Sequence, residues 1–439
     1  MADGLDIKDL QERLAEIKRR ETADGGGTPP AAAEIRTEEP ARELTASAPY
    51  QPEAVSETPS QPEVAAETPD QPAAIPEASY HVSTAMTETS QKPVVASERE
   101  TGRVAESPAG PIGLDVGTTH IVVAQNDIDH IRTTQQLNAF FTVPKSTFAK
   151  KILVNNAILH YELDNLFYII GYSADNFANM FNTSTRRSIK KGLISTDEKE
   201  GISVIQAAVV SLLNKPKRFG ETICFAVPGE PIYGTGSVLY HESIIKRFLS
   251  HMGYTPISIN EAMAVVLSEL AEEDHTGIGI SFGGGMCNVC LSYLSFPVIT
   301  FSLPMGGDYI DMMVGQAVGE PATKIKLIKE HELDFSVEPK GRVMTAIHIF
   351  YDELIRNLIE SLQRVLSSTD QIPTISASIP IVLSGGTAMP KKFTERFVKV
   401  LGNYRLPVDI STVRLAEDPL HATAKGALMM AMTESESDE

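Results

Sequence analysis

The sequence predicts an α/β fold from about Pro111 onward. Two observations predict this fold. First, short apolar runs of strand type alternate with longer segments of helical periodicity, as in α/β domains. Second, a buried strand that enters a glycine turn and leaves it as another apolar strand occurs twice, once in each half of this region. This recurrence suggests a duplicated domain with a ligand held between the two copies.

The secondary structure of this region follows from its hydrophobic periodicity. The predicted strands are Ile112–Val116, His120–Ala124, Thr222–Val227, Gly277–Phe282, Val289–Tyr293 and Ile381–Ser384. The predicted helices include Val204–Asn214, Ser243–Met252, Ala262–Glu272, Met344–Ser368 and Pro390–Val400.

The residues before this region have a different composition. Residues 21–110 are rich in Pro, Ala, Glu, Ser and Thr, and they contain a decad repeat that starts at Gln51, Gln61 and Gln71. Such a segment cannot bury enough apolar surface to offset its ordering entropy. We therefore expect a long disordered linker.

A short amphipathic helix is predicted before the linker, within residues 1–20. Apolar residues of Leu5–Arg20 recur at three-four spacing, which places them on one helix face. Three interpretations stay open: a partly formed helix in a disordered arm, a docking helix for a protein partner, or a peripheral membrane anchor. Its acidic residues would face anionic lipid, which makes the anchor the least favoured of the three.

Composition limits the partners and the compartment. The formal net charge of −19 disfavours nucleic acid as a general partner, because phosphate backbones are also negative. No apolar run reaches the length of a membrane span, and no signal-peptide pattern opens the chain. We therefore expect a cytoplasmic protein. Residues 434–439, ESESDE, are predicted to form an acidic solvated tail without a fold.

The cysteines give no indication of a metal site. Cys287 and Cys290 have C-x-x-C spacing, but the sequence contains only one other cysteine, Cys224, and so no second pair to complete a zinc site. All three lie in apolar, strand-like stretches. We expect buried thiols in a reducing compartment.

The first motif with chemical meaning is GLDVGTTHIVVA, from Gly113 to Ala124. Gly117 allows a tight turn and a close approach of the backbone to a ligand. The amides of Gly117, Thr118 and Thr119 can then point at phosphate oxygens. Asp115, at the strand end, is placed to hold Mg²⁺ through water. Taken alone, the motif also fits an ordinary hairpin with a polar turn.

Two further motifs repeat this pattern. In SFGGGMCNVCLSYL, Gly283, Gly284 and Gly285 follow one another between two buried strands. Their entropic cost indicates that something requires bare backbone there, and phosphate approach is one such requirement. In IVLSGGTAMP, Gly385 and Gly386 follow a third buried strand and precede a helix that we expect to open at Pro390. Free amides at a helix start suit a nucleotide, although a single Gly-Gly pair also occurs in ordinary loops.

In this order and spacing, the three motifs resemble those of the actin superfamily, over nearly all of residues 112–432. The resemblance implies a duplicated, ribonuclease-H-like, two-lobed nucleotide-binding domain over residues 111–433, preceded by the long disordered arm. It also implies ATP or ADP with Mg²⁺ between the lobes. Gly113–Thr119 resembles the first phosphate motif, Gly277–Val289 the second, and Val382–Pro390 the adenosine motif.

Further stretches resemble bacterial actins such as MreB or the magnetosome filament protein MamK. Ile257–Leu270 is similar to the first connecting helix, and there Glu261 matches the polar residue that orients the attacking water. Val318–Glu330 is similar to the adenine-side helix and places Lys326 near the purine or ribose. The other matching stretches are Pro304–Val314, with a GGD-x-x-D helix start, Leu415–Met429 as the second connecting segment and, more loosely, Ile169–Phe177 and Arg186–Ser195. The long interval between Thr119 and Glu221 fits a small extra subdomain.

The second phosphate motif departs from the family pattern. Ser281 and Met286 stand where the pattern has aspartate and threonine. The loss of one preorganised electrostatic contact at a reacting phosphate slows chemistry by about 10²–10³. Binding should suffer less, because the backbone amides and Asp115 remain. With Glu261 and Asp115 as the candidate catalytic residues, the resemblance implies at most a weak ATPase.

Three functions stay open. The favoured one is an ATP-dependent filament of the cytoskeleton that acts in cell shape through self-association. The second is a non-polymerising pseudo-ATPase scaffold that recruits a partner through its amino-terminal arm. The third is a small-molecule kinase of the same fold, which is disfavoured because no substrate-binding insertion stands out.

Overall fold

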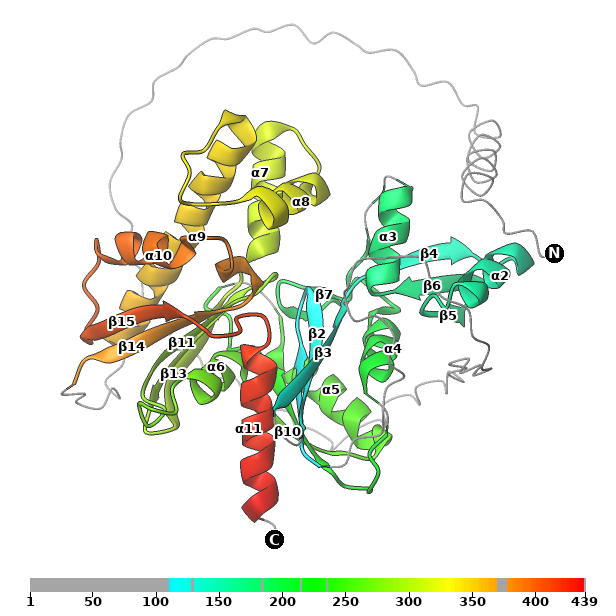
Figure 1. The fold of residues 1–439 in the computed structure, drawn as a ribbon, viewed down its shortest axis with the longest axis horizontal. Coiled ribbons are helices and arrows are strands. Elements are labelled where there is room, and N and C mark those ends of the chain that lie inside the picture. The colour runs from blue at the N-terminus through cyan, green and yellow to red at the C-terminus, as the bar shows by residue number, and fades with distance from the viewer. Residues whose placement is uncertain are drawn as a thin grey trace, which may run out of the picture. The chain divides into compact units, whose positions relative to one another are not determined.

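The computed structural model describes residues 110–437, apart from 128–129, 182, 184, 214, 234–235 and 369–376. The helix expected within residues 1–20 lies outside the described residues, and so do residues 21–109 of the linker expected at 21–110. The described region consists of two lobes that follow each other along the chain (Figure 1).

Lobe one is built on a five-stranded sheet of order β10-β9-β1-β2-β3. Its elements are β1 (Ile112–Val116), β2 (His120–Asn126), β3 (Ile131–Leu137), α4 (Gly201–Leu212), β9 (Thr222–Val227), α5 (Val238–Met252) and β10 (Thr255–Asn260). The first three strands are antiparallel neighbours, β9 runs parallel to β1, and β10 runs parallel to β9. Apolar side chains of α4 and α5 pack against the β1 side chains that point to their face of the sheet.

A small subdomain is inserted between β3 and α4, as the long interval after Thr119 predicts. It consists of β4 (Phe140–Pro144), α2 (Thr147–Asn155), β5 (His160–Leu163), β6 (Leu166–Ile170) and α3 (Tyr172–Met180). Its three strands form a separate sheet of order β4-β6-β5. A short hairpin, β7 (Ile189–Lys190) and β8 (Leu193–Ile194), then leads back to lobe one.

Lobe two repeats the topology of lobe one. Its elements are β11 (Gly277–Phe282), β12 (Cys287–Tyr293), β13 (Phe296–Leu303), α9 (Gly341–Ser368), β14 (Ile379–Ser384), α10 (Phe393–Leu401) and β15 (Ile410–Leu415). The sheet order is β13-β12-β11-β14-β15, again with three antiparallel strands followed by two parallel ones. The predicted duplication is therefore confirmed strand by strand. The insertion in this lobe is helical: α7 (Gly307–Val318) and α8 (Ala322–Glu332).

Two helices cross between the lobes. The helix α6 (Glu261–Glu269) follows the last strand of lobe one but packs on β11 and β12 of lobe two. The helix α11 (Ala422–Ser437) follows the last strand of lobe two but packs on β1 and β9 of lobe one. A Cβ atom on Gly426 would lie 1.8 Å from the carbonyl oxygen of Ala264, so the two helices touch backbone to backbone. Each lobe therefore completes its core with a helix that the other lobe supplies.

The glycines of β1 and β11 make this exchange possible. A Cβ atom on Gly113 would lie 2.1 Å from the Ala424 carbonyl oxygen in α11, and one on Gly279 would lie 2.4 Å from the Ala262 carbonyl oxygen in α6. The two glycines occupy matching places in the two copies, which again supports the duplication.

All three cysteines are buried free thiols, as predicted. Cys287 belongs to the core of lobe two, whereas Cys224 and Cys290 belong to the apolar cluster around α6 and α11. Cys287 and Cys290 point to opposite faces of β12, because side chains alternate along a strand and these two residues are three positions apart. Burial raises the pKa of each thiol, which keeps it protonated and unreactive.

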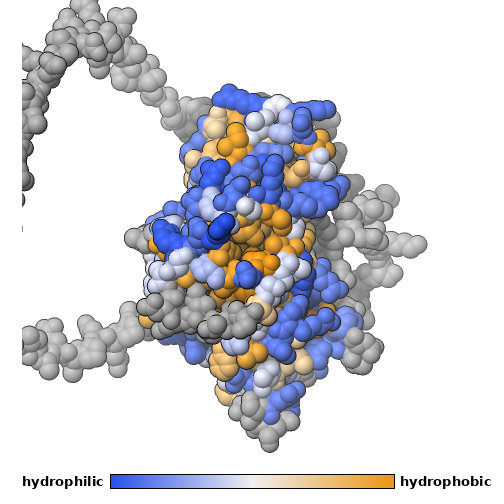
Figure 2. Space-filling view, turned by 90° about the vertical axis from the view of Figure 1, so that its left-hand side faces the viewer, coloured by the Kyte–Doolittle hydropathy of each residue, from blue (hydrophilic) through white to orange (hydrophobic). Residues whose placement is uncertain are grey.

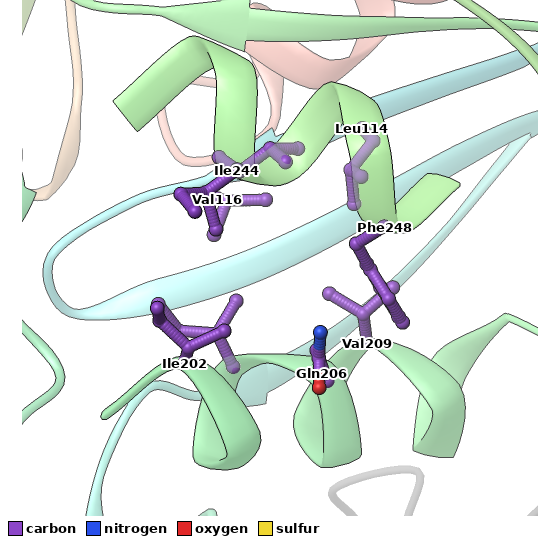
Figure 3. Close-up of a pocket in the computed structure, with 9 residues that line it drawn as sticks. Leu114, Val116, Ile202, Gln206, Val209, Ile244 and Phe248 are labelled. Carbon is purple, nitrogen blue, oxygen red and sulfur yellow. The ribbon is translucent and has the colours of Figure 1, made fainter. Parts of the chain in front are cut away.

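A small cavity lies inside lobe one, between β1, α4 and α5 (Figure 3). Its volume is about 10 Å³, and its lining is apolar apart from Gln206. A space of this size holds at most about one water molecule. It is therefore a packing defect and not a nucleotide pocket.

The side of lobe two that carries α10, β14 and β15 has an apolar centre surrounded by hydrophilic residues (Figure 2). Partly or fully exposed apolar side chains near the end of α10 and the start of β15 are Val398, Leu401, Leu406 and Val408. No helix within the described ranges is long and apolar enough to span a membrane.

The predicted strands all occur, but several predictions at helix ends are wrong. The helix α5 begins at Val238 and not at Ser243, and α6 ends at Glu269 and not at Glu272. Two further differences have a local cause. The helix expected at Pro390 begins at Phe393, because Lys392 adopts a left-handed backbone with φ 64° and interrupts the helix there. The tail expected from Glu434 continues α11 as far as Ser437. There the Ser435 hydroxyl donates to the Ala431 carbonyl, and buried Ala431 holds this part of the helix against the core.

Candidate functional site

The first glycine turn connects β1 to β2. The Gly117 amide donates to the His120 carbonyl at 2.9 Å and closes the turn. Asn138, after β3, braces it: its Nδ2 donates to the Gly117 carbonyl at 3.0 Å, and its backbone amide donates to the Thr119 carbonyl at 2.9 Å. Among the described residues, no group accepts a hydrogen bond from the amides of Thr118 and Thr119. These two amides therefore remain as donors for an anion.

The second glycine turn connects β11 to β12 and is held by its carbonyl groups. The Gly283 carbonyl accepts from the Gly307 amide at 3.0 Å and from Thr387 Oγ1 at 2.9 Å. The Gly284 carbonyl accepts from the Asp308 amide at 2.8 Å. The amides of Gly284 and Gly285 donate to no group in the part of the chain that the structure describes. This turn therefore also keeps two amides as donors, on a support made by the start of α7.

The two turns face each other and touch. A Cβ atom on Gly284 would lie 2.2 Å from Thr119 Oγ1, and one on Gly285 would lie 2.4 Å from Thr118 Oγ1. The structure thus brings together the two predicted phosphate motifs, one from each lobe. Successive backbone amides that converge in this way form an anion-binding arrangement.

The third glycine turn lies beside the second. Gly385 has φ 90°, and a Cβ atom there would lie 2.3 Å from the Phe282 carbonyl oxygen, so this position requires glycine. Its amide donates to the Pro419 carbonyl at 2.7 Å. Gly386 opens a short 3₁₀ helix (Gly386–Ala388), and a Cβ atom there would meet only Leu420 Cδ1, at 3.8 Å. The helix start beside the site is this 3₁₀ turn and not the start of α10.

Two acidic residues lie next to the turns. Asp115 Oδ1 lies 3.7 Å from the position of a Cβ atom on Gly117. Glu261 is the first residue of α6, whose amino end is capped by Asn260. Burial raises the pKa of Asp115 to about 7. Burial and the charge of Asp115 raise the pKa of Glu261 to about 8, so the two carboxyl groups interact electrostatically.

The donor chemistry of this pair fits Mg²⁺. Mg²⁺ in nucleotide sites typically takes one or two carboxylates and completes its shell with phosphate oxygens and water. Asp115 and Glu261 offer carboxylates of this kind. No group of three or more His, Cys, Asp and Glu side chains within the described ranges is arranged to hold a metal ion by itself.

Ser281 occupies the same place in lobe two as Asp115 in lobe one. Each follows a helix-facing glycine by two residues and precedes the turn glycine by two residues. Ser281 pairs in register with Asn288 on β12, so both side chains point to the face that carries α6. The position of lobe two that corresponds to Asp115 therefore carries no charge in this chain.

Asn288 is a site residue that the sequence did not reveal. It is fully buried, its Nδ2 donates to Glu261 Oε2 at 2.7 Å, and its Oδ1 accepts from the Gly229 amide at 2.8 Å. It thereby fixes the Glu261 carboxylate against a loop of lobe one. The available signal was a single amide side chain beside the mainly apolar run VCL.

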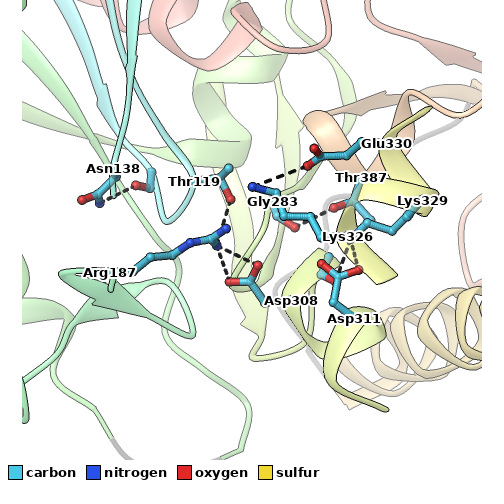
Figure 4. A network of polar contacts seen from close by, with 12 residues as sticks. Thr119, Asn138, Arg187, Gly283, Asp308, Asp311, Lys326, Lys329, Glu330 and Thr387 are labelled. Carbon is cyan, nitrogen blue, oxygen red and sulfur yellow. Dashed lines mark hydrogen bonds and ion pairs between the residues drawn. The ribbon is translucent and has the colours of Figure 1, made fainter. Parts of the chain in front are cut away.

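The lysine that contacts the start of α7 is Lys329. Its Nζ lies 2.8 Å from Asp311 Oδ1 and donates to the Gly307 carbonyl at 2.8 Å (Figure 4). Burial raises the pKa of Asp311 to about 6, although the charge of Lys329 acts in the opposite direction. Lys326, one turn earlier on α8, lies 3.9 Å from Glu330. Its predicted place near the purine or ribose stays a prediction.

Arg187 and Met286 reach across the two lobes at the turns. Arg187 Nη1 lies 2.7 and 2.8 Å from the two carboxylate oxygens of Asp308 in lobe two (Figure 4). Met286 packs with Leu193 and Val238 of lobe one. The threonine of the family pattern is thus replaced by an apolar contact between the lobes. Sequence reasoning singled out neither contact.

Comparisons with known proteins agree with this geometry. The sequence profile of the family described as Volactin matches residues 111–431. No curated protein matches the chain. Among solved structures, the MamK double helical filament has a TM-score of 0.57 at 18% identity, over 73% of this chain and 98% of that one.

Two structures of MreB5 of Spiroplasma citri are also similar. The one bound to AMPPNP has a TM-score of 0.55 at 13% identity, over 76% of this chain and 99% of that one. The one bound to ADP has a TM-score of 0.50 at 14% identity, over 75% and 98%. The predicted actin-like, two-lobed fold is confirmed by these likenesses.

Proposed function

The chain belongs to the volactin family, and we propose that it is an ATP-binding, actin-like protein that assembles into nucleotide-dependent filaments and hydrolyses ATP slowly. One observation carries this proposal. Two glycine turns from opposite lobes face each other and keep the amides of Thr118, Thr119, Gly284 and Gly285 free of acceptors among the described residues. Amides that converge from two lobes are suited to the phosphates of a nucleotide.

The nucleotide would lie with its phosphates between the two turns. Asp115 would hold Mg²⁺ through water, and phosphate oxygens would complete the shell of the ion. The nucleoside would extend toward Gly385, Gly386 and Lys326, where a Cβ atom on Gly386 would make only one ordinary contact, with Leu420. The MreB5 structures bound to AMPPNP and to ADP support this placement by analogy of fold.

Slow hydrolysis follows from the neutral Ser281. The matching position in lobe one carries Asp115, so only one of the two symmetric places supplies a carboxylate. Glu261, held by Asn288, remains available to orient a water molecule. The loss of one electrostatic contact in a preorganised site costs about 10²–10³ in rate.

Self-association is supported by the similarity in fold to the MamK double helical filament. ATP bound between the turns would contact both lobes and so stabilise one arrangement of them. We further propose a cytoplasmic location, an amino-terminal helix that docks a protein partner, and a tether at residues 21–110 that raises the local concentration of that partner.

The test combines nucleotide binding with electron microscopy. Purified protein is titrated with fluorescent ATP and ADP, then imaged and pelleted with ATP, with ADP and without nucleotide. Filaments that form only with ATP support the proposal. Binding without filaments favours the non-polymerising scaffold, and no binding overturns the proposal. Gly284→Ala should weaken binding, because its Cβ atom would collide with Thr119, whereas Gly402→Ala makes only ordinary contacts and serves as the control.

Hydrolysis is tested by phosphate release. Ser281→Asp restores the carboxylate beside Asn288, and it should raise turnover by about tenfold to a hundredfold. A wild-type turnover equal to that of ordinary bacterial actins would refute the argument for slow hydrolysis.

A further inference from the structure

An ion pair bridges the two lobes at the two glycine turns. Arg187 belongs to lobe one and Asp308 to lobe two, and Arg187 Nη1 lies within 2.8 Å of both Asp308 carboxylate oxygens. The same Nη1 lies 3.4 Å from Thr119 Oγ1, on the first turn. The guanidinium therefore lies beside the amides that face the space between the turns.

Asp308 is fixed to the second turn, whereas Arg187 is fixed to the small subdomain next to lobe one. The Asp308 amide donates to the Gly284 carbonyl, so this carboxylate moves with the second turn. Arg187 follows Arg186, whose backbone exchanges two hydrogen bonds of 2.9 Å with Phe140 in the small subdomain next to lobe one. Any opening between the turns therefore pulls Arg187 and Asp308 apart.

A phosphate between the turns requires such an opening. Thr119 and Gly284 approach so closely that even one methyl group on Gly284 would lie 2.2 Å from Thr119 Oγ1. A phosphate group is much larger than a methyl group. Its entry between these residues separates the second turn from the first and loosens the contact of Asp308 with Arg187.

The guanidinium is equipped to take the phosphate as its new partner. Within the described residues, only Nη1 of Arg187 donates a hydrogen bond, which leaves Nε and Nη2 as further donors. A planar guanidinium binds phosphate oxygens through two parallel hydrogen bonds. The Arg187 side chain is 19% exposed and that of Asp308 is 40% exposed, so the pair is only partly shielded from solvent.

We propose that Arg187 binds the terminal phosphate of a nucleoside triphosphate and exchanges Asp308 for it, so that this residue distinguishes ATP from ADP. The proposal rests on the proposed nucleotide site and adds its specificity. Asp308 competes with the phosphate for Arg187 and so lowers the affinity for a triphosphate.

The test measures the affinities for fluorescent ATP and ADP analogues in three variants of the full chain. Arg187→Gln should weaken ATP binding by about tenfold and change ADP binding by less than about twofold. Asp308→Asn should strengthen ATP binding several-fold, because Arg187 loses its competing partner. Arg218→Gln is the matched control: this arginine is 80% exposed and pairs with Glu221 before β9, and its loss should leave both affinities unchanged.

The opposite directions of the first two variants are decisive. A purely structural ion pair would weaken when either partner is removed, so both variants would then change ATP and ADP binding in the same direction. That result overturns the proposal for Arg187 but does not contradict the proposed nucleotide site. A wild-type protein that binds neither nucleotide overturns both. Circular dichroism checks the fold, and Arg187→Lys, which keeps the charge but loses the two parallel bonds, replaces Arg187→Gln if that variant unfolds.

Discussion

The crossing of α6 and α11 can be tested by adding one methyl group, in the variant Gly426→Ala. A Cβ atom there would lie 1.8 Å from the Ala264 carbonyl oxygen and 2.5 Å from its carbonyl carbon. Real Cβ atoms essentially never come within 3.0 Å of such atoms. Because both obstructing atoms are backbone, no side chain can turn away, and the helices must separate by about 1 Å.

Two effects of opposite sign decide the stability of this variant. Alanine has a higher helix propensity than glycine by about 1 kcal/mol, so the substitution would stabilise an isolated helix. Overpacking a rigid contact costs about 1–3 kcal/mol, and the backbone clash places this case at the upper end. The expected net loss is about 2 kcal/mol, which corresponds to a fall in Tm of roughly 4 °C.

Thermal unfolding followed by circular dichroism measures this loss. The control is Gly402→Ala, where φ is −59° and a Cβ atom would lie 3.5 Å from the nearest atom, the Val398 carbonyl oxygen. Its Tm should stay within about 1 °C of wild type. If Gly426→Ala melts at or above the wild-type temperature, the helices tolerate the methyl group, and the close crossing does not hold the lobes together.

Three further predictions concern buried polar groups. Asn288→Leu leaves the Glu261 carboxylate and the Gly229 amide without their partner, so the free energy of unfolding, measured by chemical denaturation, should fall by about 3 kcal/mol. A fall of less than about 1 kcal/mol would contradict the assigned contacts. Burial lowers the pKa of His241 to about 4, below the ordinary 6.5, so the unfolded chain binds a proton at a higher pH than the folded one. The free energy of unfolding of wild type, measured relative to His241→Gln, should therefore fall by up to about 3 kcal/mol between pH 6.5 and 4. A difference that stays constant with pH would refute this. Lys329→Met leaves buried Asp311 unpaired and should cost about 3–5 kcal/mol, most of which the double variant with Asp311→Leu should restore if the loss comes from the unpaired charge.

The sequence was informative where structure depends on short local patterns. The buried strands and the three glycine turns were predictable, because apolar runs and glycines specify them within a few residues. The strands β3 to β8, β10, β13 and β15 were not predicted. Some of them, such as IRTTQQL in β3, lack the apolar run of a buried strand, whereas LFYII in β6 is apolar and was missed. The start of α10 depended on the conformation of one residue, Lys392, which no periodicity reveals.

The contacts between side chains across the site could not be predicted from the sequence, for a different reason. Arg187 meets Asp308 across 121 positions of the chain, and Asn288 meets Glu261 across 27. Nothing in a single sequence indicates which polar side chains meet after folding. The resemblance implied that Lys326 lies near the purine or ribose, which stays a prediction, and it gave no indication that Lys329 contacts the start of α7.

The exchange of helices also fixes the order in which the molecule can be completed. The sheet of lobe one is made from residues that emerge early in synthesis, but the helix that covers it at Gly113 comes from residues 422–437. Until that segment leaves the ribosome, one apolar face of lobe one has no cover. Contacts of such long sequence separation form slowly, and exposed apolar surface of this kind attracts chaperones or leads to aggregation. The first lobe to be synthesised is therefore among the last parts to be finished.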